Sequence, residues 1–490
     1  MNQKQQNFGD LQFICERVVW YSKQKPEDLI QYFQQNKMDA LYSIPDKKRG
    51  MIICGRDASE RFYRIAERHL KSRIKEKNKT NLDEFVKALK EEFSRIFLKS
   101  GDDVTETNMD RMITTAYRSI SRKFEPQIHY IPCAVFSSSG TECFDIGPVS
   151  FLHKSKFEST YGYEINQLRV QLKDRHQELC ATAIVDGFSA NRIATEDQSQ
   201  QLADHMVDGL LSTFGSYEWI AVVTISKCSA EVSYNRAVST TKTALNILKI
   251  LLGGEFTYRV RTGNDHGGFS KSARLTRKEN GKLEISLTTS SSGNVPGDNW
   301  LKILNANAAY HFGLASKVLE LSLGFSDPPP LCSRFIDALS WFGDAVSEQS
   351  HAAKIIKFVT SIERITGTGI EKDDDGIERR VTDIVINRSA ILYSVATGET
   401  IADSINKVTD IYDCRSNLVH GSLSPFDKSC ASYAHKAADI SRMVLLAGLD
   451  YFFSLGIDAF SMNQKNLKAE YKSLEAIYRQ PPGEAEEKTL

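Results

Sequence analysis

The chain has 490 residues, of which 62 are lysine or arginine and 62 are aspartate or glutamate, so its formal net charge at pH 7 is zero. No overall field therefore attracts the chain to nucleic acid or to an anionic membrane, and any nucleic-acid site has to be local. This length predicts about two to three domains and allows a sizeable buried core.

Several classes of protein are disfavoured by what the sequence lacks. The nine cysteines are scattered without a C-x-x-C pair, and no phosphate loop, dinucleotide turn or zinc-binding helix motif occurs. No charged-then-apolar leader opens the chain, and its longest apolar stretch, residues 442–460, is interrupted by Asp450 and Asp458. We therefore expect a cytoplasmic protein with reduced thiols, no membrane span, no cofactor and no metal.

The first 125 residues are dominated by three helical patterns, at 58–75, 81–100 and 105–121. The second pattern begins at Asn81 with Glu84 three residues later, which is a helix-capping signal. Residues 1–125 are therefore predicted to form a helical N-terminal region.

Residues 126–296 mix both kinds of element. Strand-like runs are predicted at 128–136, 143–151 and 217–226, and helices at 163–181, 198–214 and 236–252. Asn280-Gly281 lies between two alternating runs and predicts a two-residue hairpin turn. Gly147-Pro148 inside an apolar run is interpreted as a bend in an edge strand. This region is a mixed α/β domain whose strand order the sequence leaves open.

A Ser/Gly/Pro-rich break at 288–298 marks the main predicted boundary. Helices alone are predicted after it, at 300–323, 332–346, 350–366, 377–395, 400–420 and 430–455. Residues 297–480 are therefore an all-α domain, and the polar residues 481–490 a disordered tail. The whole chain is predicted to be an α+β multidomain protein.

The predicted helix 400–420 has an arginine on its apolar stripe. The stripe residues recur three or four positions apart; they are Ile401, Ile405, Val408, Tyr412, Arg415 and Val419. A guanidinium keeps its charge, so burying it costs on the order of several kcal/mol unless it is paired or faces a ligand. Two interpretations stay open: Arg415 pairs or reaches the rim of the bundle, or it faces a ligand or a partner subunit.

Two neighbours of Arg415 can take part in chemistry. Asn417 adds a hydrogen-bonding amide, and His420 precedes Gly421, a glycine in the position that favours a helix end. Five residues of helix rotate a side chain by about 140°, so Arg415 and His420 share a face only if the last turn frays. A permanent cation and a titratable imidazole are the groups that phosphoryl transfer on RNA requires.

The stretch YDCRSNLVHG, residues 412–421, resembles the R-x4-6-H signature of the HEPN superfamily of ribonucleases and RNA-binding proteins. Its residue pattern is similar to that of the ApeA-like branch of this superfamily. The stretches AKIIKFVTSIERITG (353–367) and INRSAILY (386–393) resemble that branch's neighbouring helices. The resemblance covers roughly residues 300–456. It implies that 297–480 is an all-α HEPN helical bundle.

The resemblance also implies roles for individual residues. In a HEPN ribonuclease the substrate's 2′-hydroxyl attacks the adjacent phosphate without a metal, which leaves a 2′,3′-cyclic phosphate. His420 would then transfer protons and Arg415 would stabilise the phosphorane. Asn417 matches the polar residue of the motif, although here Ser416 directly follows the arginine. Glu363 would orient Arg415 or form a hydrogen bond with the ribose of the RNA. In the alternative interpretation, Glu363 is a surface carboxylate at a helix end without a functional role.

HEPN sites form across a twofold homodimer, and the resemblance implies the same here. It further implies an endoribonuclease toxin of anti-phage abortive-infection defence, with tRNA as its expected substrate, a phage-derived trigger, and residues 126–296 as a sensor or RNA-recognition domain. The alternative is a non-catalytic HEPN module that dimerises and binds RNA or protein.

One basic stretch in the mixed domain has two interpretations. Arg259 and Arg261 are predicted to alternate on a strand, and a glycine-rich loop leads from them to Arg274 and Arg277. With aromatic residues interleaved, these arginines would bind an RNA backbone. The alternative is a solvated strand face.

Overall fold

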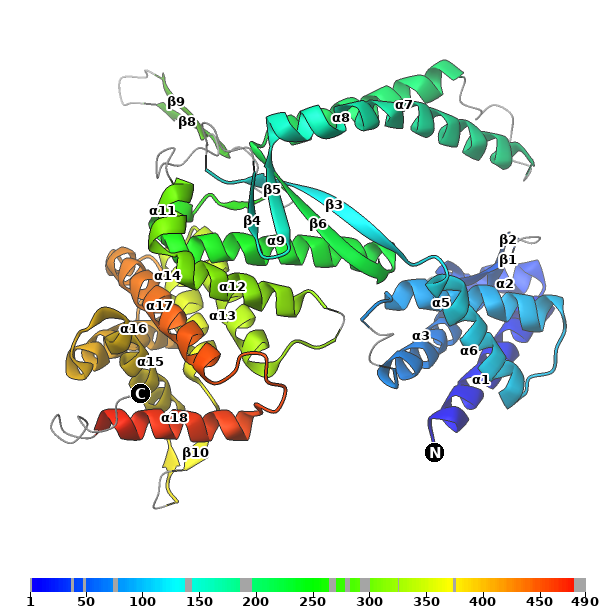
Figure 1. The fold of residues 1–490 in the computed structure, drawn as a ribbon. Coiled ribbons are helices and arrows are strands. Elements are labelled where there is room, and N and C mark those ends of the chain that lie inside the picture. The colour runs from blue at the N-terminus through cyan, green and yellow to red at the C-terminus, as the bar shows by residue number, and fades with distance from the viewer. Residues whose placement is uncertain are drawn as a thin grey trace. The chain divides into compact units, whose positions relative to one another are not determined.

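The computed structural model describes residues 2–36, 39–46, 50–73, 78–136, 143–185, 196–263, 270–277, 283–290, 300–324, 326–372 and 376–479. The chain forms two compact units: Met1–Ile128 with Thr224–Ala237, and His129–Val223 with Val238–Leu490. The described residues are mainly helical with a small sheet region, which agrees with the predicted α+β class (Figure 1). None of the described helices combines the length and apolarity that crossing a membrane requires.

The first unit is a set of helices around one apolar core. Its helices are α1 (Gln3–Lys23), α2 (Pro26–Gln35), α3 (Gly55–Lys71), α5 (Leu82–Phe93) and α6 (Glu106–Ser121), with short elements η1 (Asp39–Leu41), β1 (Ser43–Asp46), β2 (Gly50–Ile53) and η2 (Ser94–Lys99). Asn81 caps α5 as predicted, since its side chain accepts a hydrogen bond from the Asp83 N–H. Helix α1 was not predicted because its sequence is polar, although Leu11, Ile14 and Val18 on one face are buried.

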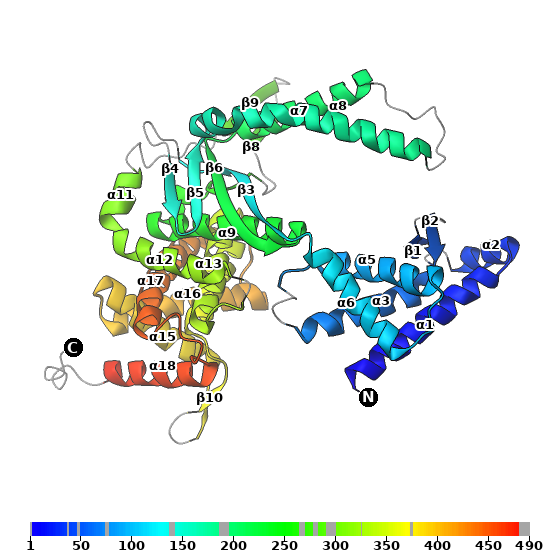
Figure 2. The same cartoon turned by 45° about the vertical axis from the view of Figure 1, so that its right-hand side comes forward.

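A five-stranded sheet has the order β4-β5-β6-β3-β7. The strands are β3 (Glu125–Ala134), β4 (Cys143–Ile146), β5 (Val149–His153), β6 (Trp219–Cys228) and β7 (Arg261–Thr262). Between β5 and β6 the chain forms α7 (Lys154–Val185) and α8 (Glu196–Gly215), which lie side by side in both ribbon views (Figures 1 and 2).

Two turn predictions in this region have different outcomes. Ile146 pairs with Val149, so Gly147-Pro148 is a tight turn between two strands, and the predicted bend within one strand is wrong. The predicted antiparallel pairing of the two runs is confirmed by β8 (Ser270–Arg277) and β9 (Leu283–Ser290), but the predicted two-residue turn is not confirmed, since the last described pair is Arg277 with Leu283. The predicted turn residues, Asn280 and Gly281, lie outside the described residues.

The C-terminal part is mainly helical, but helices alone were predicted there, and Glu371–Lys372 instead pairs with Glu378–Arg379. The helices are α9 (Ala230–Leu252), α10 (Gly254–Thr257), α11 (Trp300–Asn307), α12 (Ala309–Ser322), α13 (Pro330–Ser347), α14 (His351–Thr366), α15 (Val381–Thr397), α16 (Ile401–His420), α17 (Ser429–Ser454) and α18 (Gln464–Arg479), with a small hairpin of β10 (Glu371–Lys372) and β11 (Glu378–Arg379). Helix α18 was not predicted. The predicted boundary at 296/297 and the predicted tail 481–490 lie outside the described residues.

Helices α14 and α17 approach each other closely. A Cβ atom added at Gly448 would lie 2.8 Å from the Ile365 side chain, so a larger residue there would push the helices apart. The hydroxyls of Ser361 and Ser441 are 3.1 Å apart in the same interface. This contact fixes the position of α14 in the bundle.

A buried ion network joins α15 to the β10–β11 hairpin and α18. The Arg388 side chain is fully buried; its Nη2 lies 2.8 Å from Glu371 and its Nε 2.6 Å from Glu475. Arg379 adds a second cation, 2.8 Å from Glu475. Burial disfavours the Glu371 carboxylate, but the hydrogen bond from Arg388 and the other contacts outweigh it and hold its pKa below the usual value.

Replacing Arg388 should therefore destabilise the fold strongly. We expect Arg388→Ala to lower the free energy of unfolding by about 3–5 kcal/mol, because two buried carboxylates lose the cation that bridges them and only Arg379 is left to balance both charges. Urea denaturation followed by circular dichroism measures the change. Arg364→Ala is the matched control: Arg364 pairs with Asp337 at the exposed surface, where a pair contributes about 0–1 kcal/mol. Equal losses in the two variants would contradict the assigned role of Arg388.

Candidate functional site

Helix α16 has the boundaries that its sequence predicts. The Thr400 side chain caps its start by accepting a hydrogen bond from the Asp403 N–H. Gly421 ends it with φ 79°, a left-handed conformation that favours glycine, and the Leu423 N–H donates to the Asn417 carbonyl at 3.1 Å. The helix is therefore regular through His420, and its last turn does not fray.

Arg415 lies where the buried stripe of α16 reaches the surface. Val408 and Tyr412 are buried, whereas Val419 is exposed and the Arg415 side chain is 26% exposed. Its Nη2 is 3.7 Å from Glu363 Oε2, and its guanidinium carbon is 5.8 Å from the centre of the Tyr412 ring. The cation thus lies at the rim, beside an acidic residue and against an aromatic ring.

The guanidinium of Arg415 is not used for hydrogen bonding within the described residues. Its Nε atom is buried and has no hydrogen-bond partner there, and the 3.7 Å separation from Glu363 is too long for a hydrogen bond. Arginine carries five N–H donors in a planar group that matches a phosphate. Arg415 can therefore donate to an anionic ligand without breaking an existing hydrogen bond.

Tyr412 fixes Glu363 and was not predicted as a site residue. Its hydroxyl donates a 2.9 Å hydrogen bond to Glu363 Oε1. Burial, and then the negative charge of Glu363, raise the pKa of Tyr412, so the phenol stays protonated and keeps donating at neutral pH. The signal in the sequence was the three-residue spacing of Tyr412 and Arg415, which places both on one helix face.

The other two predicted residues are not joined to this cluster in one chain. Asn417 and His420 are exposed, and their side chains make no hydrogen bond to any residue that the structure describes. Because α16 is regular, the His420 side chain leaves the helix about 140° around the axis from Arg415. The structure brings together Arg415, Glu363 and Tyr412, and it leaves His420 and Asn417 on the surface.

The predicted basic strand is wrong in part. Phe256 lies in the short helix α10 and Arg259 in a turn, where its guanidinium lies 5.1 Å from the Tyr258 ring centre. Arg261 is on β7, so the two arginines do not alternate on one strand. Arg274 and Arg277 lie on β8, whose side chains are outside the described part, as is the loop with Asp265 and His266.

The described residues contain no cluster of three or more His, Cys, Asp or Glu side chains that could hold a metal ion. None of the cysteines with described side chains forms a disulfide. No protein-family model, curated protein or solved structure matches the chain.

The hydrogen bond between Tyr412 and Glu363 can be tested by its contribution to stability. We expect Tyr412→Phe to lower the free energy of unfolding by about 1 kcal/mol, because Glu363 loses its hydrogen-bond donor. Tyr310→Phe is the control, since Tyr310 is 64% exposed and its hydroxyl makes no hydrogen bond to a described residue. Urea denaturation of both variants measures the difference, and an unchanged Tyr412→Phe protein would contradict the assigned bond.

Proposed function

We propose that the chain is a metal-independent endoribonuclease of the HEPN type, with its nuclease site around Arg415 and His420. The observation that carries the proposal is the half-buried Arg415 guanidinium, which makes no hydrogen bond to a described residue and lies beside Glu363. The unused N–H donors of this guanidinium match the oxygens of a phosphate, which would accept hydrogen bonds from them. The motif that contains it ends in an imidazole, which can move protons.

The reaction requires two proton transfers and stabilisation of one charge. The 2′-oxygen of the RNA loses its proton and forms a bond to phosphorus, the bond from phosphorus to the 5′-oxygen breaks, and that oxygen gains a proton. His420 takes part in proton transfer. Arg415 binds the phosphorane oxygens, where charge accumulates, and Glu363 with Tyr412 holds the guanidinium in place.

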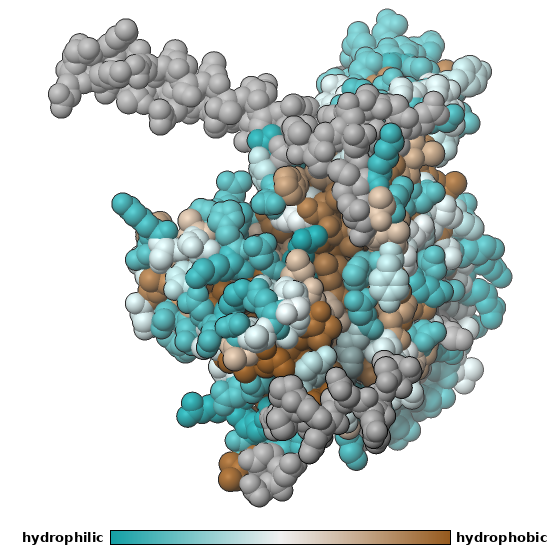
Figure 3. Space-filling view, turned by 60° about the vertical axis from the view of Figure 1, so that its left-hand side comes forward, coloured by the Kyte–Doolittle hydropathy of each residue, from teal (hydrophilic) through white to brown (hydrophobic). Residues whose placement is uncertain are grey.

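The separation of Arg415 and His420 on α16 is the reason to propose a site shared between two subunits. In a twofold homodimer, Arg415 of one protomer would act with His420 of the other. Val419 (51% exposed) and Phe426 (94% exposed) flank His420 and are apolar, as expected for an interface between copies. Figure 3 shows apolar side chains gathered between hydrophilic ones on one face of the molecule.

The biological role is proposed from the resemblance. The active enzyme would cut tRNA in the cytoplasm and stop translation in a phage-infected cell, and it would stay inactive until a phage-derived trigger appears. The alternative function is a non-catalytic HEPN module that dimerises and binds RNA or protein. The exposed His420, which has no hydrogen bond to Arg415, Glu363 or Tyr412 in one chain, favours that alternative if no dimer forms.

RNA cleavage tests the proposed activity. We expect the protein to cut total tRNA in the presence of EDTA and to leave 2′,3′-cyclic phosphate ends, and Arg415→Ala and His420→Ala each to reduce the rate at least about a hundredfold. Arg364→Ala and His205→Ala, which change exposed residues of the same types, should cut at the normal rate. RNA that is bound equally by all these proteins and never cut, even with phage lysate added, would support the non-catalytic alternative.

Mixed dimers test whether the site is shared. If Arg415 and His420 come from different subunits, a dimer of one Arg415→Ala and one His420→Ala chain contains one intact site and one that lacks both groups. Randomly mixed chains should then recover about one quarter of the normal cleavage rate. The reason is that half of the dimers contain one chain of each variant, and in each of these dimers one of the two sites is intact. No recovery above the single variants, in a sample shown to contain mixed dimers, would place both groups in one chain.

A further inference from the structure

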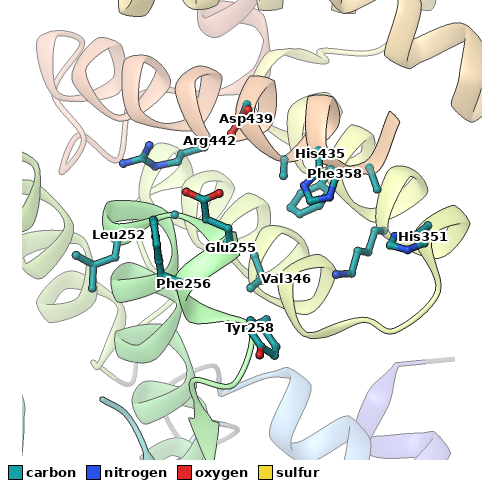
Figure 4. A pocket seen from close by; sticks show the side chains of 15 residues that line it. Leu252, Glu255, Phe256, Tyr258, Val346, His351, Phe358, His435, Asp439 and Arg442 are labelled. Atoms are coloured by element: carbon teal, nitrogen blue, oxygen red, sulfur yellow. The ribbon is translucent and has the colours of Figure 1, made fainter. Parts of the chain in front are cut away.

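A second candidate site is a pocket of about 360 Å³ between the segment that follows α9 and the helices α14 and α17 (Figure 4). This volume is in the range of small-molecule binding sites. Its lining includes three aromatic side chains, two carboxylates and four basic groups: Phe256, Tyr258, Phe358, Glu255, Asp439, His351, Lys354, His435 and Arg442. The pocket therefore combines flat apolar surfaces with charges of both signs.

The aromatic side chains suit a planar ligand. Phe358 is buried in the wall, whereas Phe256 and Tyr258 are 42% and 45% exposed. Exposed aromatic rings in a pocket offer faces on which a base can stack, and such stacking contributes about 1–3 kcal/mol per base. An aliphatic or purely inorganic ligand would leave these rings in contact with water.

The basic groups of the pocket fall into two kinds. Arg442 is structural: its Nε donates to the Ile250 carbonyl and its Nη2 to the Leu251 carbonyl, both at 2.7 Å, which closes the end of α9. Lys354 is different, because its ammonium makes no ion pair or hydrogen bond with any described residue. It lies with His351 in the first turn of α14, which contains no acidic residue. The Lys354 ammonium supplies a positive charge and the His351 ring supplies a possible N–H donor, and this end of the pocket suits a phosphate.

The carboxylates of Glu255 and Asp439 are also without a hydrogen bond or ion pair among the described residues. In Figure 4, Glu255 and Asp439 lie toward Arg442, and His351 lies at the opposite side of the pocket. Carboxylates repel a phosphate but accept hydrogen bonds from the N–H groups of a base. A ligand that combines an anionic group, N–H donors and a flat ring matches these three kinds of side chain.

We propose that this pocket binds a purine nucleotide, with its phosphate at Lys354 and His351, its base against Phe256 and Tyr258, and its N–H groups on the two carboxylates. Guanine is the best match, because its ring N–H and its amino group are adjacent and can donate to one carboxylate together. Lys354 lies nine residues before Glu363 on α14, a rise of roughly 13 Å. The proposed site is thus separate from Arg415 and does not depend on RNA cleavage.

Titration calorimetry of the full chain with GMP, guanosine, AMP and inorganic phosphate tests the proposal. We expect GMP to bind more tightly than AMP, and phosphate alone to bind far more weakly. Lys354→Ala should weaken GMP binding by at least about tenfold, the effect of one lost charge-assisted hydrogen bond, and should leave guanosine binding unchanged. Asp439→Asn should weaken GMP and guanosine by a similar factor, because both ligands share the base.

The matched control is Lys317→Ala, which removes an exposed lysine of α12 that pairs with Glu320 and should bind every ligand normally. The circular dichroism spectrum of each variant establishes that it is folded. Absence of nucleotide binding to the folded chain would overturn the proposal. The same conclusion would follow if phosphate bound as tightly as GMP, or if Lys354→Ala weakened guanosine as much as GMP.

Discussion

The C-terminal end of α14 is the constraint on which the proposed nuclease site depends. The last carbonyls of a helix have no partner within it and need donors from elsewhere. Here the donors are side chains from three other helices: Arg334 bonds the carbonyls of Arg364 and Gly367, Tyr471 bonds that of Ile365, and Arg388 bonds that of Thr366. The helix end that carries Glu363 is therefore fixed by donors from three helices, of which Arg388 and Tyr471 are fully buried.

Arg388 connects this helix end to the rest of the bundle. Its guanidinium also binds Glu371 and Glu475, and it lies 4.7 Å from the centre of the Tyr471 ring. A buried charge network is costly to assemble but fixes geometry when all its groups are paired. Through Arg388, the C-terminal helix α18 and the small β10–β11 hairpin contribute to the position of Glu363, although neither element contacts Arg415.

The proposed site combines a rigid support with exposed reactive groups. Tyr412 and Glu363 are held by a hydrogen bond inside the bundle, and Arg415 lies above them with its donors uncommitted. His420 is at the surface, where a second subunit can approach it. Helix α14 also carries Lys354 in its first turn, so one helix supplies a residue to each of the two proposed sites.

The sequence by itself determined the elements whose signals are local. The helix predicted over residues 400–420, which ends before Gly421, agrees with α16. The alternating runs around Asn280 predicted the pairing of β8 with β9. Both predictions succeed because helix ends and hairpins depend on residues only a few positions apart. Local signals also misled, since the aromatic and basic residues 256–261 have strand character, yet α10 and a turn precede Arg261, which alone of them lies in a strand.

Only the tertiary structure decided the partners of the charged residues. Tyr412 meets Glu363 across 49 residues of sequence, and Arg388 meets Glu475 across 87. Arg388 lies on the apolar stripe of α15, four residues from both Ile384 and Leu392, but this local pattern does not show which carboxylates pair with it. The partners of Arg388 come from segments that are far apart in the sequence and meet only when the bundle packs. A local stretch of sequence therefore cannot predict them.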